Sequence, residues 1–246
     1  IKGLYELGVE IEENSELDLL VAYKEHENDP RIPEVCADMA KEMGEGRYYA
    51  DLSERMAQFE LTLLDWAEAH KGARKYVAFA DKCWPAFPSQ FGFEPCYVNS
   101  RLAMKPDSSR FVCVNSNCGI LEINAISEDS IVRVAQVAYH YPDVVGNRSG
   151  NMAVAAIRKS NINGFFDVAC TDDRIYALYS GRSYDEAGLN IGNCDFLIAF
   201  DWSGNFIGAL HLSPALRTIC IDRESGMLYG LAYTDTRSVI YNVDPM

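Results

Sequence analysis

The feature that most constrains the fold is a regular succession of short strands in residues 165–243. Apolar and polar residues alternate there with a period of two, and Gly, Asp, Asn and Ser separate the runs. Four strands are expected first, at Phe165–Cys170, Arg174–Ser180, Phe196–Asp201 and Phe206–Leu212. A second unit begins with Leu216–Ile221, Met227–Tyr233 and Ser238–Val243. Four strands followed by a restart are typical of β-propeller blades.

A similar four-strand unit lies upstream. Its expected strands are Val98–Lys105, Arg110–Asn115, Gly119–Ile126 and Ile131–Tyr139. Two long connections flank this unit, an aromatic and proline-rich one at 81–100 and another at Pro142–Gly164. The sequence therefore predicts two complete blades and part of a third.

The beginning of the chain adds strands to this prediction. Lys2–Ile11 alternates like a half-buried strand, and Leu17–Tyr23 and Lys75–Ala80 are expected as two more. We expect Lys2–Ile11 to pair with Ser238–Val243, because joining the two ends of the chain closes the ring and removes exposed edges. Residues 17–80 would then hold one degenerate blade.

Helical patterns compete with strands in the same region. A proline precedes Glu34–Met43, which suits a short helix. Asp51 and Glu54 resemble a capping box, and apolar residues follow at spacings of three and four as far as residue 70. The alternative is a strand at Phe59–Trp66. We favour the helix there.

Length and composition fit one domain. A chain of 246 residues can form one all-β domain, so we expect a single propeller domain over residues 1–246 with a partly helical insertion at about 33–70. A net charge of −14 argues against nucleic acid as a partner, because that binding depends on Lys and Arg patches. No apolar run is long enough to span a membrane.

The start of the sequence and the cysteines bear on processing, disulfide bonds and zinc binding. The sequence opens with Ile1 and without a leader, so we expect a processed product, an expression product or a fragment. Eight cysteines are too sparse for a disulfide scaffold, and no Cys-x-x-Cys pair indicates zinc. Cys113, Cys170 and Cys220 each lie in an apolar strand, where we expect them to pack in the core.

Residues 165–243 resemble the TolB-like six-bladed propeller family of bacterial, often lipid-anchored, extracytoplasmic proteins. The resemblance is carried by DFLIAFDWSGN at Asp195–Asn205, by Phe206–Leu212, by Ile219–Asp222, by LYGL at Leu228–Leu231 and by Tyr241. Within the first motif, Asp201 can accept hydrogen bonds from a turn and Gly204 can adopt positive φ.

The resemblance has consequences for fold and location. It implies six blades, so either part of the ring lies outside this sequence or residues 24–74 hold further blades. It also implies a periplasmic or cell-surface protein, with a lipid anchor upstream of Ile1. It implies no catalytic residues.

A binding site is expected on one face of the propeller. Turns from first to second and from third to fourth strands are short, whereas the long segments 81–97, 142–164 and 180–194 belong to the opposite face. Long loops on a rigid scaffold are where binding residues concentrate. The candidates on these loops are Trp84, Phe87, Asn147, Arg148, Arg182, Tyr184, Asp185, Glu186 and Asn190. The same side chains also fit solvated loops with aromatic rings packed on their own blades.

Enzyme and cofactor motifs are not found in the sequence. There is no nucleophile elbow, no His-Glu-x-x-His and no P-loop, and the four histidines are scattered. We interpret His26-Glu27-Asn28-Asp29 as an acidic loop, not a metal site. We therefore expect no cofactor, and a non-enzymatic binding or scaffold module for a protein, peptide or glycan. The alternatives are a propeller hydrolase or lyase with a divalent metal at the channel mouth, and an architectural domain of a larger chain.

Overall fold

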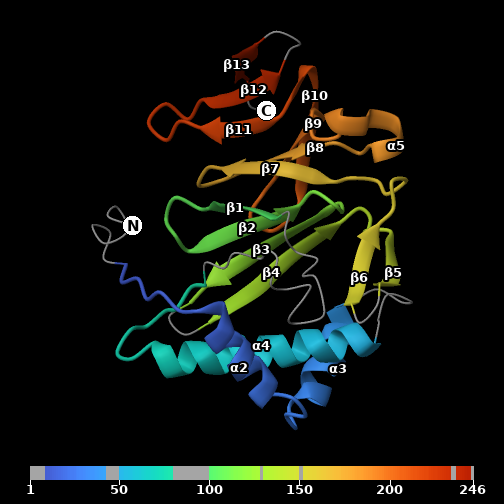
Figure 1. The fold of residues 1–246 in the computed structure, drawn as a ribbon. Helices are drawn as coiled ribbons and strands as arrows, with labels where there is room; N and C mark the ends of the chain where they lie inside the picture. Colours follow the sequence, from blue (N-terminus) through green and yellow to red (C-terminus); the bar gives the residue numbers. More distant parts are fainter. Residues whose placement is uncertain are drawn as a thin grey trace. The chain divides into compact units, whose positions relative to one another are not determined.

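The computed structural model describes residues 9–42, 50–79, 100–127, 130–149, 152–233 and 237–244 (Figure 1). The chain divides into two compact units. One comprises residues 1–95 and 146–155, and the other comprises residues 96–145 and 156–246. That residues 1–246 form a single propeller domain stays a prediction.

The second unit is built of antiparallel sheets. The first blade is ordered β1-β2-β3-β4, with strands Ser100–Met104, Arg110–Asn115, Ile120–Ile126 and Ile131–Ala138. The second blade comprises β7 to β10 in sequence order, with strands Phe165–Cys170, Ile175–Tyr179, Cys194–Phe200 and Phe206–Leu216. The third sheet is ordered β11-β12-β13, with strands Thr218–Ile221, Leu228–Tyr233 and Ser238–Val243. All eleven strands predicted for this unit are confirmed, with shifts of a few residues at some ends.

The first strand of each sheet lies towards the middle of the unit. Strand β7 contacts both β1 and β11, and Figure 1 shows it between the first blade and the third sheet. This arrangement is typical of a β-propeller, in which the first strand of each blade lies next to the common axis.

Two apolar cores join the sheets. Val112, Leu121 and Ile123 of the first blade pack against Phe165 and Phe200 of the second blade. A separate core joins the other face of the second blade to the third sheet, through Leu178, Leu197, Leu216, Leu228 and Val243. Strands of the second blade are therefore buried on both faces. Residues that point away from these cores stay accessible.

One of the three cysteines that we expected in the core is exposed. Cys113 and Cys170 are half-buried, whereas Cys220 is exposed. The prediction that Cys220 packs in the core is wrong. Its neighbour Ile219 points into the core instead, so the alternation of β11 turns Cys220 to the other face.

The segment between the two blades is not the unstructured connection that we expected. It contains β5, Val144–Ser149, and β6, Met152–Ile157, which pair as a two-stranded sheet. The sequence favoured a loop because its proline, glycine and asparagine residues hide the short apolar runs.

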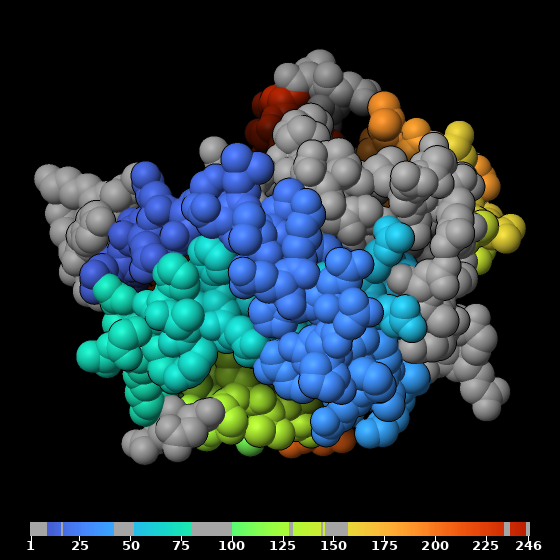
Figure 2. All heavy atoms as spheres, turned by 60° about the horizontal axis from the view of Figure 1, so that its bottom comes forward, coloured from blue at the N-terminus to red at the C-terminus, as the bar shows by residue number. Residues whose placement is uncertain are grey.

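The described residues of the first unit that precede residue 80 are mainly helical. They contain α2, Glu16–Glu25, α3, Ile32–Glu42, and α4, Ala50–His70. The residues of α2 and α3, coloured blue in Figure 2, form a continuous surface of this unit. The helices predicted at Glu34–Met43 and 51–70 are confirmed, and the alternative strand at Phe59–Trp66 is wrong.

Helix α2 replaces the strand predicted at Leu17–Tyr23. The Ser15 hydroxyl accepts a hydrogen bond from the Leu17 backbone N–H at 3.1 Å, which caps the helix. Leu20 and Tyr23 pack with Met56 of α4, whereas Leu17 and Val21 are 69% and 58% exposed. Leu20 and Tyr23 are three residues apart on the buried face of the helix, and Leu17 and Val21 are four residues apart on its exposed face. A short apolar run does not distinguish a helix from a strand by itself.

Two other strand predictions are wrong where the structure describes them. Residues 9–11 and 75–79 are not in strands. Residues 2–8 lie outside the described residues, and so does the predicted connection at 81–97. A degenerate blade in residues 17–80 is also wrong for its described part, because that part is mainly helical.

Candidate functional site

The short turns of the blades meet on one face of the second unit. The Arg110 guanidinium donates to the Trp202 carbonyl at 2.7 Å, and the Trp202 indole donates to the Thr171 carbonyl at 3.1 Å. Asp201 accepts from the backbone of Ser203 and Asn205, and Gly204 has a φ of 82°, as expected for this turn. Turns of neighbouring blades thus support one another, and the long loops emerge at the opposite ends of the strands.

The long-loop face is organised by the link that enters the second blade. The Asn161 side chain is buried and donates to the Asn117 carbonyl at 2.9 Å. Its carbonyl oxygen accepts from the Asp143 backbone N–H at 2.7 Å. One amide side chain therefore holds the β2–β3 turn, the link and the segment after β4 together.

Gly164 also attaches the link that enters the second blade to its neighbours. Its N–H donates to the Ser116 carbonyl at 2.9 Å, and its carbonyl accepts from the Ser180 N–H at 3.0 Å. A Cβ atom at residue 164 would lie 1.7 Å from the Cys118 carbonyl oxygen. Glycine is required because the two backbones approach so closely.

The β8–β9 loop is held by hydrogen bonds to the link before β7 and by hydrogen bonds within the loop. Asn163 donates its N–H to the Arg182 carbonyl at 2.8 Å, and the Gly181 N–H donates to the Asn163 carbonyl at 2.9 Å. Ser183 and Glu186 form a capping box at α5, Tyr184–Ala187. Hydrogen bonds from the Ser183 backbone and hydroxyl hold the pKa of the Glu186 carboxyl below its usual value.

Arg182, a predicted site residue, has a structural role in this loop. Its guanidinium lies 3.3 Å from an Asp195 carboxylate oxygen. It also donates to the Asn190 carbonyl at 3.4 Å and to the Asn193 carbonyl. These contacts tie the β8–β9 loop to the start of β9, so the charge of Arg182 is compensated within the loop.

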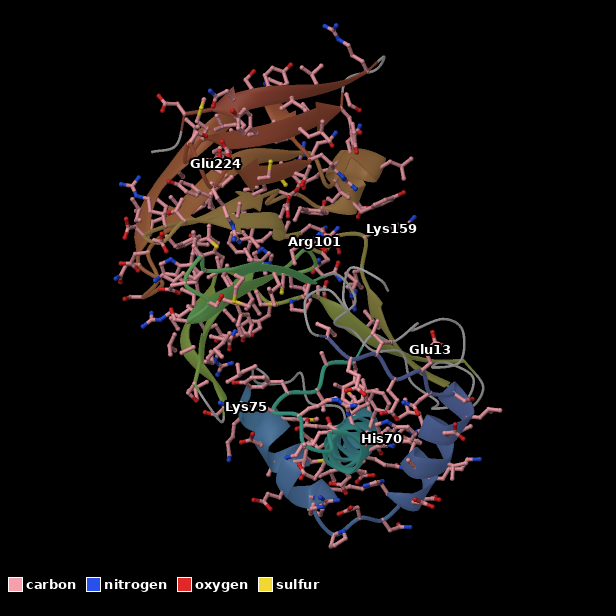
Figure 3. The ribbon with its side chains drawn as sticks, turned by 90° about the vertical axis from the view of Figure 1, so that its left-hand side faces the viewer. Glu13, His70, Lys75, Arg101, Lys159 and Glu224 are labelled. Carbon is pink, nitrogen blue, oxygen red and sulfur yellow. The ribbon has the colours of Figure 1, made fainter. Side chains whose placement is uncertain are left out.

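Two other predicted residues are accessible. Tyr184 is 41% exposed, and the Lys159 ammonium lies 5.7 Å from the centre of its ring. Asp185 is exposed, and its N–H donates to the Lys159 carbonyl at 3.2 Å. Figure 3 shows Lys159 pointing outward, on a different side of the blades from Glu224 in the β11–β12 turn.

Apolar residues that the sequence analysis missed lie in the same segments. Ile162 is exposed and bridges to Ser183, and Leu189 is 87% exposed in the short 3₁₀ helix Gly188–Asn190. Single apolar residues within polar loops were the signal that could have identified them. We call Lys159, Ile162, Tyr184, Asp185 and Leu189 the loop-face patch.

The binding role of all the predicted site residues stays a prediction, and four of them cannot be placed by their side chains. Trp84 and Phe87 lie outside the described residues. Asn147 and Arg148 belong to β5, and their side chains are outside the described part. The structure therefore brings together Arg182, Tyr184 and Asp185, and adds Lys159 from the preceding link.

A cluster of possible metal ligands occurs in the helical unit. His26, Asp29 and Asp65 offer atoms within 4.8 Å of one another, in the part of the chain that is described. The Arg31 guanidinium lies 2.7 Å from both carboxylates, and His26 lies 2.9 Å from Asp65. The arginine already compensates the carboxylates, so the cluster acts as an ion-pair network between α4 and the α2–α3 loop.

A further group lies between the two blades, below the long loops. The His140 ring packs on Gly119 and lies 6.3 Å from the Tyr179 ring. Its Nε2 atom is buried without a hydrogen-bond partner in the described structure. Burial lowers the pKa of this imidazole, which keeps it neutral at pH 7.

Four-stranded blades with a rigid loop face define a β-propeller protein without a recognised catalytic constellation among the described residues. The TolB-like 6-blade propeller-like family model matches residues 95–224, which is more than half of the chain. The chain belongs to the TolB-like propeller family.

Solved structures with similar folds are distant. Hydrazine synthase of Kuenenia stuttgartiensis is 13% identical with a TM-score of 0.37, and the match covers 58% of this chain and 32% of that one. The WD40 repeats of RRP9 are 11% identical with a TM-score of 0.36, over 58% of this chain and 34% of theirs. The chain thus spans about a third of the length of these structures. No curated protein matches its sequence.

Among the described residues, no helix combines the length and apolar character needed to cross a membrane.

Proposed function

We propose that this chain is a non-enzymatic binding or scaffold module that acts through its long-loop face. The observation that carries the proposal is the loop-face patch, where exposed Tyr184 and Leu189 are presented by a loop that hydrogen bonds hold in place. Pre-organised loops lose little conformational entropy on binding. Exposed aromatic and apolar groups on such loops suit recognition of a partner surface.

The chemistry of the patch indicates the class of partner. It combines an aromatic ring, two aliphatic side chains, a lysine and an aspartate. A protein or peptide segment fits this mixture, and a glycan can stack on the tyrosine ring. The net charge of −14 disfavours nucleic acid.

We propose that the protein is located outside the cytoplasm, and its family membership supports this. TolB-like propellers suggest a bacterial extracytoplasmic protein, in the periplasm or at the cell surface. A lipid anchor upstream of Ile1 belongs to the same proposal.

Peptide and glycan arrays test the binding function. We expect the 246-residue chain to bind a restricted set of probes, and Tyr184→Ala and Leu189→Asp each to weaken that binding about tenfold or more, because contact residues at an interface centre carry most of the affinity. Glu224→Ala, on the short-turn side, is the matched control and should bind like the unsubstituted chain. Binding that neither patch variant changes would contradict the proposal, as would the lack of any probe that binds.

Metal titration separates this proposal from a propeller hydrolase or lyase. Calorimetry with Mn²⁺, Zn²⁺ and Ca²⁺ should detect no ion bound with micromolar affinity at the loop face. Tight binding of one ion, together with hydrolysis of a probe, would favour the enzyme instead.

A further inference from the structure

His26 lies at the end of α2 with a hydrogen-bond acceptor at each of its two ring nitrogens. Its Nδ1 atom lies 2.8 Å from the Ala22 carbonyl oxygen, and its Nε2 atom lies 2.9 Å from a carboxylate oxygen of Asp65 in α4. A carbonyl and an ionised carboxylate can only accept hydrogen bonds. A neutral imidazole has one N–H group, whereas a protonated imidazole has two. Only protonated His26 can therefore donate to both oxygens.

The charged groups around the ring favour the protonated form. The carboxylates that face it are Asp65 of α4 and Asp29 of the α2–α3 loop. The Arg31 guanidinium donates two hydrogen bonds to each of these carboxylates. Because two carboxylates share one guanidinium, protonation of His26 makes the cluster electrically neutral. Arg31 also holds the pKa of Asp65 well below its usual range, which keeps this carboxylate ionised.

The position of His26 in α2 acts in the same direction. His26 is the C-terminal cap of this helix. The last carbonyl groups of a helix carry a partial negative charge, which stabilises a nearby cation. Partial burial lowers the pKa of the imidazole, but the Ala22 carbonyl and the Asp65 carboxylate raise it more, so that it lies above its ordinary value of 6.5.

Helix α2 depends on its contact with α4. It has ten residues, and a helix of this length is marginal in water by itself. Its contact with α4 includes a small core of Leu20, Tyr23 and Met56. The hydrogen bond between His26 and Asp65 joins the end of the helix to the same partner. A change in the charge of His26 therefore acts on an element that has few other contacts to hold it.

We propose that protonated His26 holds α2 on α4, and that this contact loosens as the pH rises. In the neutral ring, one nitrogen presents a lone pair to an oxygen that cannot donate, and the cluster keeps a net negative charge. The folded-state pKa is raised, so the stabilisation is complete below about pH 6.5 and is lost as the pH rises through the folded-state value. This pH-sensitive contact lies within the helical unit and is independent of the loop-face patch.

Nitrogen-15 NMR of the imidazole rings in the 246-residue chain tests the protonation state. We expect the His26 ring to titrate above pH 6.5 and to carry a proton on both nitrogens below that pH. Asp65→Asn should lower the pKa of His26, because the amide carries no charge. Asp18→Asn, on the exposed face of α2, is the matched control and should leave it unchanged. Each titration is repeated with EDTA, since a bound metal ion would also change the ring signals.

Hydrogen exchange between pH 6 and pH 8.5 tests the consequence for α2. We expect protection factors of α2 amides to fall in total by about tenfold for each unit by which the pKa of His26 in the docked helix exceeds that in the open state. Amides of β8, in the other unit, should not respond. His26→Gln should abolish the dependence on pH. His70→Gln is the control and should keep it, because that ring meets Glu12 through one nitrogen only.

Four results would overturn the proposal. One is a His26 ring that titrates at or below pH 6.5. Another is a raised pKa without any change in the protection of α2, which would show that other contacts hold the helix. The third is a dependence on pH that persists in His26→Gln. The fourth is a titration that EDTA changes, because the ring would then be a metal ligand.

Discussion

At the scale of single residues, Asp167 joins two sheets with one carboxylate. It accepts from the Ile219 N–H at 2.8 Å and from the Thr218 hydroxyl, both at the start of β11. It lies where β7 departs from regular register with β8, so the bulge turns its side chain towards the neighbouring sheet. A period-two pattern predicts the strand but not this local departure.

Replacement of Asp167 tests that connection. We expect Asp167→Ala to lower the free energy of unfolding of the second unit by about 1–3 kcal/mol, because the Val168 N–H, the Thr218 hydroxyl and the Ile219 N–H lose their acceptor. Asp167→Asn should lose less, since its amide oxygen still accepts. Urea unfolding followed by far-UV circular dichroism measures both. Asp172→Ala, in the exposed β7–β8 turn, is the control, and an equal effect there would contradict the assigned role.

At the scale of elements, the end of β4 and the end of β8 meet through aromatic rings. Tyr139 lies 5.8 Å from Tyr179 and 5.9 Å from Phe165, measured between ring centres. His140 follows Tyr139 and packs on Gly119 at the start of β3. The two blades therefore share a partly aromatic contact with one neutral histidine in it.

The stability of this contact should depend on pH. Because burial lowers the pKa of folded His140 below 6.5, the unfolded chain binds a proton first, and stability is lost as pH falls below about 6.5. We expect His140→Phe to reduce the decrease in melting temperature between pH 7.5 and pH 5.5. His211→Phe, an exposed site on β10, should not. Identical pH profiles for His140→Phe and the unsubstituted chain would contradict this.

At the scale of the whole molecule, one turn design recurs on the short-turn face. Asp107 accepts from Ser109, Asp201 from Ser203, and Asp222 from Glu224, each two residues further on. Side-chain hydrogen bonds from Lys105, Asn205 and Ser225 lower the pKa of Asp107, Asp201 and Asp222, respectively, and the backbone hydrogen bonds lower it further. Each sheet of the second unit thus has an aspartate turn.

Acid should weaken all three sheets together. The lowered pKa values mean that the stabilisation is present above about pH 4 and is lost as pH falls through the folded-state values. We expect the triple variant Asp107→Asn, Asp201→Asn, Asp222→Asn to show a smaller decrease in melting temperature between pH 5 and pH 3 by calorimetry. A decrease as large as that of the unsubstituted chain would show that other carboxylates determine acid stability.

Much of the second unit could be predicted from the sequence. Alternation in Phe165–Cys170 and Leu228–Tyr233 identified their strands, because a strand that packs on one or both faces needs β-branched and aromatic residues at regular positions. The first unit was predicted less well. In Leu17–Tyr23 the pattern is short, and packing of Leu20 and Tyr23 on α4 decided for the helix.

For the candidate site too, some features could be proposed from the sequence and others are visible only in the structure. The β8–β9 loop and Tyr184 could be proposed from the sequence, because long polar loops and their aromatic residues are visible without a structure, and their role in binding stays a prediction. The sequence did not identify Lys159 or Ile162, whose positions beside this loop depend on hydrogen bonds between segments twenty or so residues apart. That Arg182 contributes to a binding site stays a prediction, and only the structure shows that Asp195 and nearby carbonyls compensate its charge.

The sequence by itself determined the strands of the three propeller sheets and their short turns, because alternation and turn residues are local properties that each of these segments carries. Only the tertiary structure decided which charges are compensated and which apolar residues stay exposed. Those properties depend on contacts between residues far apart in the chain, such as Asp167 with Ile219 and His26 with Asp65.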